Sequence, residues 1–182
     1  MWELIIVAVI VIAAVGMYNS LVRLREQGDG AWADIDVQLK RRYDLIPNLV
    51  ETVKGYASHE KDTLERVVQA RSSAMSAQGP AAKAEAEGML TGALKSLFAL
   101  SEAYPQLQAA EGFRDLQASL SQIEEQVAQA RRYYNAVVRD FNTRTQTFPS
   151  VLIARAFGFT EREFFEVAES EKAVPKVDFG GN

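Results

Sequence analysis

The chain has 182 residues, 48% of them apolar, with a formal net charge of −4 and no cysteine. This length fits one domain with a hydrophobic core. The missing cysteine excludes disulfides, thiol catalysis, zinc–thiolate sites and a lipidated cysteine anchor. The acidic balance disfavours nucleic acid as a partner, because nucleic-acid-binding proteins usually carry a clustered basic face.

An unbroken apolar run, LIIVAVIVIAAVGM, begins at Leu4, and mostly apolar residues extend it to Val22. Residues 4–22 match the roughly 17–25 residues with which a helix crosses a bilayer. A cleaved signal peptide is one alternative, although Glu3 stands where such a peptide carries basic residues. A buried core helix is another, although the run has no polar face. We predict a membrane anchor whose partner is the lipid bilayer.

The residues that flank the anchor predict its orientation. Trp2 and Tyr18 lie where interfacial aromatic residues are expected. Glu3 is the charge on the N-terminal side, whereas Arg23 and Arg25 follow the span. The positive-inside rule therefore places the N-terminus outside and the body in the cytoplasm. A periplasmic or extracellular body is the alternative.

Beyond the anchor, apolar residues recur at three- and four-residue steps, which predicts an amphipathic helix that continues out of the bilayer. Gly28 and Gly30 fall inside it. Each glycine costs ~1 kcal/mol relative to alanine in a helix interior, so we predict a hinge or kink there, with local close packing as the alternative.

The stretch VQLKRRYDLIPNLVETVKGY combines a basic run at residues 40–42 with Pro47. A proline in a helix interior removes a hydrogen bond, but it is tolerated in a first turn. Asp44 can cap a helix that begins near Leu45. We therefore predict a corner here, with the basic run closing one helix and the next helix following.

Two further breaks divide the rest of the body. The second helix is expected to end before Gly79, and a third to start at or after Pro80. Pro105 interrupts that helix. A short apolar segment over residues 151–159, a short helix around Phe164 and Phe165, and then irregular acidic chain complete the prediction.

The fourth helix has the clearest pattern, a heptad seam over about five repeats, which is typical of coiled coils and left-handed bundles. At ~1.5 Å per residue it would run roughly 54 Å. Its apolar positions are Phe113, Leu116, Leu120, Ile123, Val127, Ala130, Tyr134, Val137, Phe141 and Phe148, with Thr145 the polar member.

No segment alternates with period two, so we predict no strand. The fold class is all-α, an N-terminal transmembrane helix continuing into a long antiparallel bundle of about four helices. Residues 1–22 are the anchor, residues 23–160 the helical bundle, and residues 161–182 an acidic C-terminal tail.

Several motifs together resemble the LemA family. They are YNSLV from Tyr18, the block AWADIDVQLKRRYDLIPNLVETVKGYASHEKDTLERVVQAR from Ala31, and ARRYYNAVVRDFN, FPS and FGF further on. The resemblance implies a bacterial single-pass inner-membrane protein with an exposed helical bundle. It also implies relatives associated with membrane metalloproteases of the HtpX type and with magnetosome formation. It supplies no catalytic residues.

No catalytic, cofactor or metal site is predicted. His59 is the only histidine, and a metal site in a helical bundle needs several converging ligands. Glu124 and Glu125 are adjacent on a helix and point in different directions, so they are expected on a solvated face. No serine has a nucleophile motif. The chain is therefore predicted not to be an enzyme.

The one candidate site is the basic cluster of Lys40, Arg41 and Arg42, as a partner-docking patch. The alternative is a solvated helix end, where cations favour the helix dipole. About 25 Å of helix separates the cluster from the membrane, which weakens a lipid-binding role. An acidic protein partner, or the acidic tail after Glu161, is preferred.

These features predict a membrane-tethered scaffold or adaptor that forms homo-oligomers or presents its bundle to another membrane protein. The resemblance implies an HtpX-type protease as that partner. A membrane-surface sensor of stress or signals is the alternative, and a metal-dependent enzyme is a third hypothesis.

Overall fold

The computed structural model describes residues 1–166, in which every regular element is a helix. The all-α prediction is confirmed. The helices are α1 (Trp2–Tyr56), α2 (Lys61–Ser76), α3 (Pro80–Ser101), α4 (Pro105–Ala109), α5 (Glu111–Gln146) and α6 (Ser150–Ala156).

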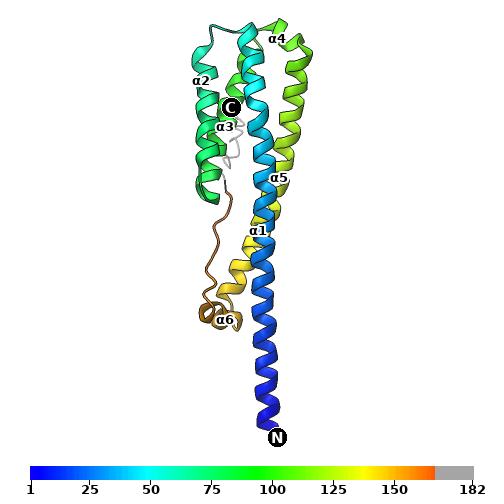
Figure 1. The fold of residues 1–182 in the computed structure, drawn as a ribbon, viewed down its shortest axis with the longest axis vertical. Coiled ribbons are helices and arrows are strands. Elements are labelled where there is room, and N and C mark those ends of the chain that lie inside the picture. Colours follow the sequence, from blue (N-terminus) through cyan, green and yellow to red (C-terminus); the bar gives the residue numbers. More distant parts are fainter. Residues whose placement is uncertain (167–182) are drawn as a thin grey trace, which may run out of the picture.

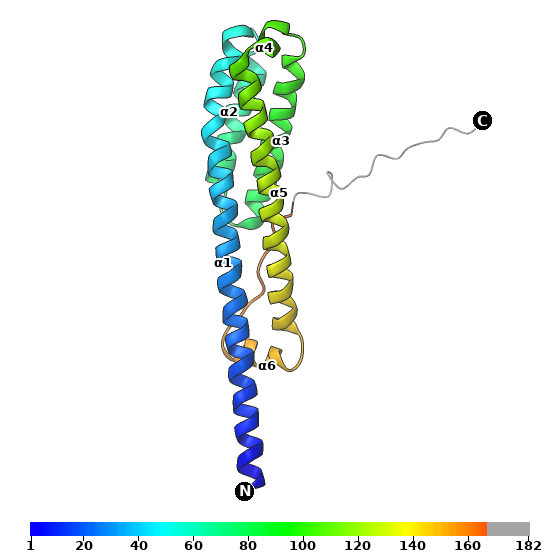
Figure 2. The ribbon, with the colours of Figure 1, turned by 90° about the vertical axis from the view of Figure 1, so that its right-hand side faces the viewer.

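The helices form an elongated antiparallel bundle on one long stalk (Figures 1 and 2). α1 runs the whole length of the molecule and α5 returns alongside it. α2 and α3 form a shorter hairpin that covers the distal part, away from the N-terminus. α6 lies at the other end of α5, beside the N-terminal half of α1 where the bundle ends. The predicted helix that continues from the anchor into the bundle is present.

The predicted corner at Pro47 is wrong, because α1 continues through this residue to Tyr56. The chain turns at residues 57–60 instead. Pro47 has no N–H for the carbonyl of Tyr43, four residues earlier. That carbonyl accepts a hydrogen bond of 2.8 Å from Arg71 Nε on α2. The neighbouring helix therefore replaces the missing hydrogen bond.

Gly28 and Gly30 do not interrupt α1 either. A Cβ atom on Gly28 would lie 3.4 Å from Cζ of Arg162, whereas one on Gly30 would meet nothing within 4 Å. Arg162 reaches Gly28 because Asp29 holds its guanidinium, with 2.6 Å between Nη2 and Oδ1. Gly28 therefore packs against Arg162, and α1 is continuous through both glycines.

The main core lies between α1 and α5 and under the α2–α3 hairpin. The predicted seam of α5 is buried or half-buried from Phe113 to Thr145. Phe148 is the exception, because it lies beyond the end of α5 and is 80% exposed. α3 begins with Pro80 at its first turn, as predicted, and it ends at Ser101, before the break predicted at Pro105. The short helix α4 that begins at Pro105 was not predicted.

A second, smaller core joins α6 and the C-terminal end of α5 to α1 through Ala154, Phe141 and Leu21. After α6 the chain turns back and runs up beside α1 and α5 without helical structure as far as residue 166. The short helix predicted around Phe164 and Phe165 is therefore wrong. Phe165 is buried in the main core. The rest of the predicted acidic tail, residues 167–182, lies outside the described residues.

Among the described residues, α1 is the helix long and apolar enough to cross a membrane. Its apolar window has a mean hydropathy of 2.5, and only 6% of it is buried. These apolar side chains therefore do not belong to the protein core. They lie on the part of α1 that extends alone past α6 (Figure 1).

Candidate functional site

The structure divides the predicted docking patch. Lys40 and Arg41 are exposed on α1, but Arg42 is only 3% exposed and lies inside the bundle. The prediction that Arg42 belongs to an exposed docking surface is wrong. Its position on the buried face follows from the helical period, because Leu39, Arg42 and Ile46 are three and four residues apart and α1 does not end between them.

Arg42 joins three helices. Its Nη1 donates to Glu87 Oε2 on α3 at 2.9 Å, and its Nη2 donates to Thr91 Oγ1 at 3.0 Å and to Glu124 Oε1 on α5 at 2.8 Å. The side chain of Glu87 is as buried as that of Arg42, whereas Glu124 is 47% exposed. The result is a buried ion pair with a second carboxylate at the rim.

Tyr43 completes this network. Its hydroxyl donates to the remaining oxygen of Glu87, Oε1. Burial raises the pKa of the Tyr43 hydroxyl above its ordinary value, and the hydrogen bond to Glu87 raises it further. The hydroxyl therefore stays protonated near neutral pH. Both oxygens of Glu87 are occupied, so neither residue is free to act as a general base.

The network has a structural use. A cavity of about 190 Å³ lies beside Arg42, and the Nε atom of Arg42 has no hydrogen-bond partner among the described residues. None of the described residues that line this cavity is a histidine, and the hydroxyl of Thr91 beside it accepts a hydrogen bond from Arg42. Removing one partner of a buried ion pair typically costs 3–5 kcal/mol. The Arg42–Glu87 pair therefore fixes how α1, α3 and α5 sit against one another.

The other polar residues considered from the sequence do not converge. His59 is exposed in the turn between α1 and α2, and the neighbouring Glu60 accepts a hydrogen bond of 3.0 Å from Tyr104. Glu124 pairs with Arg42, while Glu125 is exposed. Within residues 1–166, no group of three or more histidine or carboxylate side chains could hold a metal ion.

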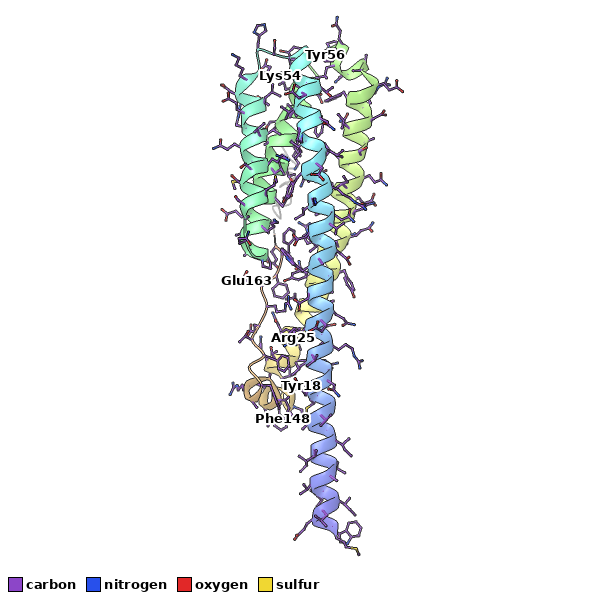
Figure 3. The ribbon with its side chains drawn as sticks, viewed as in Figure 1. Tyr18, Arg25, Lys54, Tyr56, Phe148 and Glu163 are labelled. Carbon is purple, nitrogen blue, oxygen red and sulfur yellow. The ribbon has the colours of Figure 1, made fainter. Side chains whose placement is uncertain are left out.

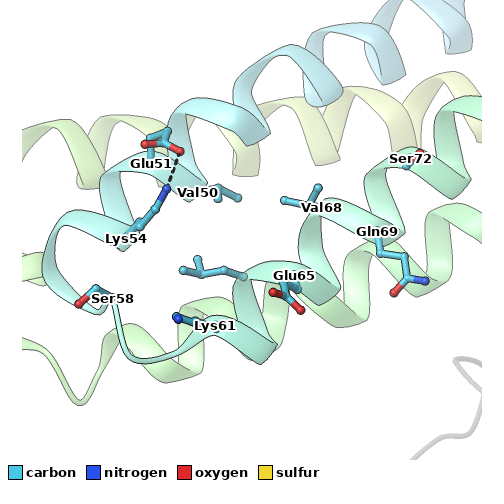
Figure 4. A pocket seen from close by; sticks show the side chains of 10 residues that line it. Val50, Glu51, Lys54, Ser58, Lys61, Glu65, Val68, Gln69 and Ser72 are labelled. Carbon is cyan, nitrogen blue, oxygen red and sulfur yellow. Dashed lines mark ion pairs between the residues drawn. The ribbon is translucent and has the colours of Figure 1, made fainter.

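A groove of about 800 Å³ opens between α1 and α2 near the distal end. Val50, Leu64 and Val68 supply its apolar surface, and Val68 is 50% exposed. Charged side chains line its edges, with Glu51 and Lys54 paired at 3.6 Å (Figure 4). An apolar surface with a charged edge suits the apolar face of a partner helix.

Two asparagines on α5 bind the main chain of the returning segment, residues 160–166. Asn142 donates to the carbonyl of Arg162 and accepts from the N–H of the same residue, both at 2.9 Å. Asn135 makes the same pair of bonds with Phe165, at 3.1 and 2.9 Å. Tyr134 donates to the carbonyl of Glu163 at 2.9 Å.

The spacing of these asparagines matches an extended peptide. Seven helical residues rise ~10.5 Å, and the three residues from 162 to 165 span ~10 Å when extended. α5 thus contacts the segment in the way a neighbouring strand would. Sequence reasoning missed this site. The available signal was a pair of asparagines one heptad apart, each next to a buried seam residue.

An antiparallel helical bundle in which one helix begins with a segment long and apolar enough to cross a membrane is the architecture of a membrane-associated helical protein. The LemA family model matches residues 31–179. Since that match covers most of the chain, the chain belongs to the LemA family.

Curated relatives agree with this assignment. The chain is 26% identical over 174 residues to magnetosome protein MamQ of Magnetospirillum gryphiswaldense, covering 81% of the chain and 64% of that protein. It is 25% identical over 162 residues to protein LemA of Metamycoplasma hominis, covering 87% and 73%. The chain thus spans about 64% of the magnetosome relative's length. Neither name states an enzymatic activity.

Proposed function

We propose that the protein is a membrane-tethered scaffold or adaptor, without catalysis, that presents a binding surface at a distance from the bilayer. The continuity of α1 carries this proposal, since one helix contains both the apolar segment and the distal end of the bundle. From Val22 to Tyr56, 34 residues rise ~51 Å. The groove between α1 and α2 lies at the far end of this rod.

The surface chemistry supports a protein partner. The groove offers the half-exposed side chain of Val68 to a partner helix, with the buried Val50 at its base. Lys40 and Arg41 remain exposed for an acidic segment. We propose as occupants a second copy of the chain or another membrane protein. A metalloprotease of the HtpX type is a candidate by family resemblance. The charge bias at Arg23 and Arg25 supports a cytoplasmic body.

Cross-linking in native membranes tests this proposal, and the cysteine-free chain makes single labelled sites simple to introduce. A photo-cross-linker on Val68→Cys should form adducts, whereas one on Glu125→Cys, exposed on α5, should form far fewer. Mass spectrometry then identifies the partner as the same chain or another protein. Recovery of monomer alone from Val68→Cys would contradict the proposal.

A membrane-surface sensor is the second candidate, favoured by how residues 160–166 are attached. Hydrogen bonds from side chains of α5 to the main chain hold this segment, so it can detach without unfolding a helix. Release under membrane stress should raise hydrogen exchange at Arg162 and Phe165. Unchanged exchange under every stress applied would exclude this role.

A further inference from the structure

An exposed apolar patch surrounds α6. Phe148, before this helix, is 80% exposed, Leu152 within it 58%, and Phe157 after it 62%. Large exposed apolar patches mark interaction sites. Figure 3 places Phe148 and Tyr18 at the same level, where α1 leaves the bundle.

The patch is continuous with the surface of the anchor helix. The ring of Tyr18 on α1 lies 4.8 Å from that of Phe157 and 5.8 Å from that of Phe159, between centroids. Two residues later, Ser20 accepts a hydrogen bond from Arg144 of α5. Residues of α1 from Tyr18 onward therefore lie beside α6 and the end of α5.

The length of the apolar segment places the bilayer surface at this level. Between charged Glu3 and Tyr18, whose ring contacts Phe157, there are 14 residues, which rise ~21 Å as a helix. The hydrocarbon core of a bilayer is ~30 Å thick. The anchor fills this thickness only if the apolar residues up to Val22 are included, and these lie beside α6. A bilayer that covers the anchor therefore reaches α6.

Charge at the same end fits a lipid surface. Arg23 on α1, Arg144 on α5 and Arg155 on α6 are all exposed. Cations just outside the hydrocarbon favour anionic headgroups, tyrosines such as Tyr18 are enriched at the interface, and Phe and Leu form the apolar face of helices that lie in it. The patch thus combines the residue types of a helix that lies in a membrane surface.

We propose that residues 148–157 form a second membrane contact, with α6 lying in the headgroup–acyl boundary of the bilayer that the anchor crosses. The partner is the lipid surface. The inference rests on the proposed tether, because it requires that residues 4–22 span the membrane. It adds that the bundle is held to the membrane at two places and cannot swing freely about the anchor.

The test uses the full chain in phosphatidylcholine–phosphatidylglycerol vesicles, with spin labels on single-cysteine variants. Ile10→Cys reports the anchor, Leu152→Cys reports α6, and Lys40→Cys is the aqueous control. Accessibility to oxygen relative to a water-soluble nickel complex gives the depth of each label. We expect Ile10 to be deep, Leu152 shallow but several-fold more oxygen-accessible than Lys40, and Lys40 aqueous.

The outcomes separate this inference from the tether. If the label at Leu152 is as accessible to water as the label at Lys40 while the label at Ile10 is deep, the proposed α6 contact is wrong and the proposed tether stands. An aqueous Ile10 would overturn both. Spin–spin broadening between Leu152 labels of different chains would show that a second copy of the chain, and not lipid, covers the patch. Leu152→Ser with Phe157→Ser, both at exposed positions, should shift a label at Phe148→Cys toward water; an unchanged depth would contradict the proposal.

Discussion

Arg71 Nε donates a hydrogen bond of 2.8 Å to the main-chain carbonyl of Tyr43. This carbonyl is the one that Pro47 leaves without a helical donor. A side chain from α2 thus supplies the hydrogen-bond donor that α1 lacks at this position, and α1 continues beyond the proline to Tyr56.

The first prediction is a coupling between Arg71 and Pro47. Arg71→Ala should lower the free energy of unfolding by ~1–3 kcal/mol, because a buried carbonyl loses its donor. The same substitution should cost ~1 kcal/mol less in a Pro47→Ala background, where the alanine supplies a main-chain N–H that can bond the carbonyl. Urea unfolding of the four proteins measures this, with Arg66→Ala as the exposed control. Additive effects would mean that the two residues act independently.

Arg42 and Arg41 provide a matched pair for the second prediction. Arg42→Ala should destabilise the bundle by ~3–5 kcal/mol, because it leaves Glu87 buried and unpaired. Arg41→Ala should change stability by no more than ~0.5 kcal/mol, since Arg41 is exposed. Adding Glu87→Leu to Arg42→Met should recover much of the loss. Similar melting temperatures for Arg42→Ala and Arg41→Ala would rule out the buried pair.

The third prediction concerns alkaline pH. The folded state raises the pKa of Tyr43 above its unfolded value near 10, so the folded protein retains a proton that the unfolded chain loses. The contribution of Tyr43 to the free energy of unfolding therefore has its full value below about pH 10 and decreases as the pH rises above that value. Tyr43→Phe should flatten the alkaline decline in unfolding free energy. Tyr133→Phe, at an exposed position, should leave the decline as it is. Equal slopes would contradict the assignment.

The fourth prediction is that each asparagine of α5 protects one main-chain amide of residues 160–166 from hydrogen exchange. Asn142→Ala should speed amide exchange at Arg162, because the N–H of Arg162 loses its acceptor, and Asn135→Ala should do so at Phe165. Asn142→Asp keeps an acceptor but loses the donor, so the amide of Arg162 should stay more protected than in Asn142→Ala. Asn48→Ala, exposed on α1, is the control. Exchange that rises equally at both amides in each variant would indicate general loosening instead.

The fifth prediction tests the α5 seam. Leu120→Ala and Ile123→Ala should each cost ~2–5 kcal/mol, since both side chains are buried. Met89→Ala on α3, where the side chain is 55% exposed, should cost much less. Thermal unfolding in detergent measures all three. A seam variant that melts like wild type would place that residue outside the core.

The parts of the fold that follow local rules could be predicted. Apolar length predicted the long apolar helix, the heptad period predicted the buried face of α5, and Pro80 predicted the start of α3. The errors arose where contacts between residues far apart in the sequence determine the local structure. Local rules make Pro47 a helix start, but Arg71, distant in sequence, satisfies the freed carbonyl. Because α1 does not end near Pro47, the helical period places Arg42 on the buried face of α1. The partners of Asn135 and Asn142 come from a segment without periodicity, so no pattern predicted them.

The absence of a break in α1 has a mechanical consequence. A rigid rod converts a change in angle at one end into a sideways displacement at the other. At a rise of ~1.5 Å per residue, each degree of tilt of the anchor would move the distal groove by roughly 0.9 Å. Transmembrane helices adjust their tilt to bilayer thickness. If α1 spans the bilayer as we propose, a change in its tilt that the α6 contact permits would therefore shift the groove relative to the membrane surface.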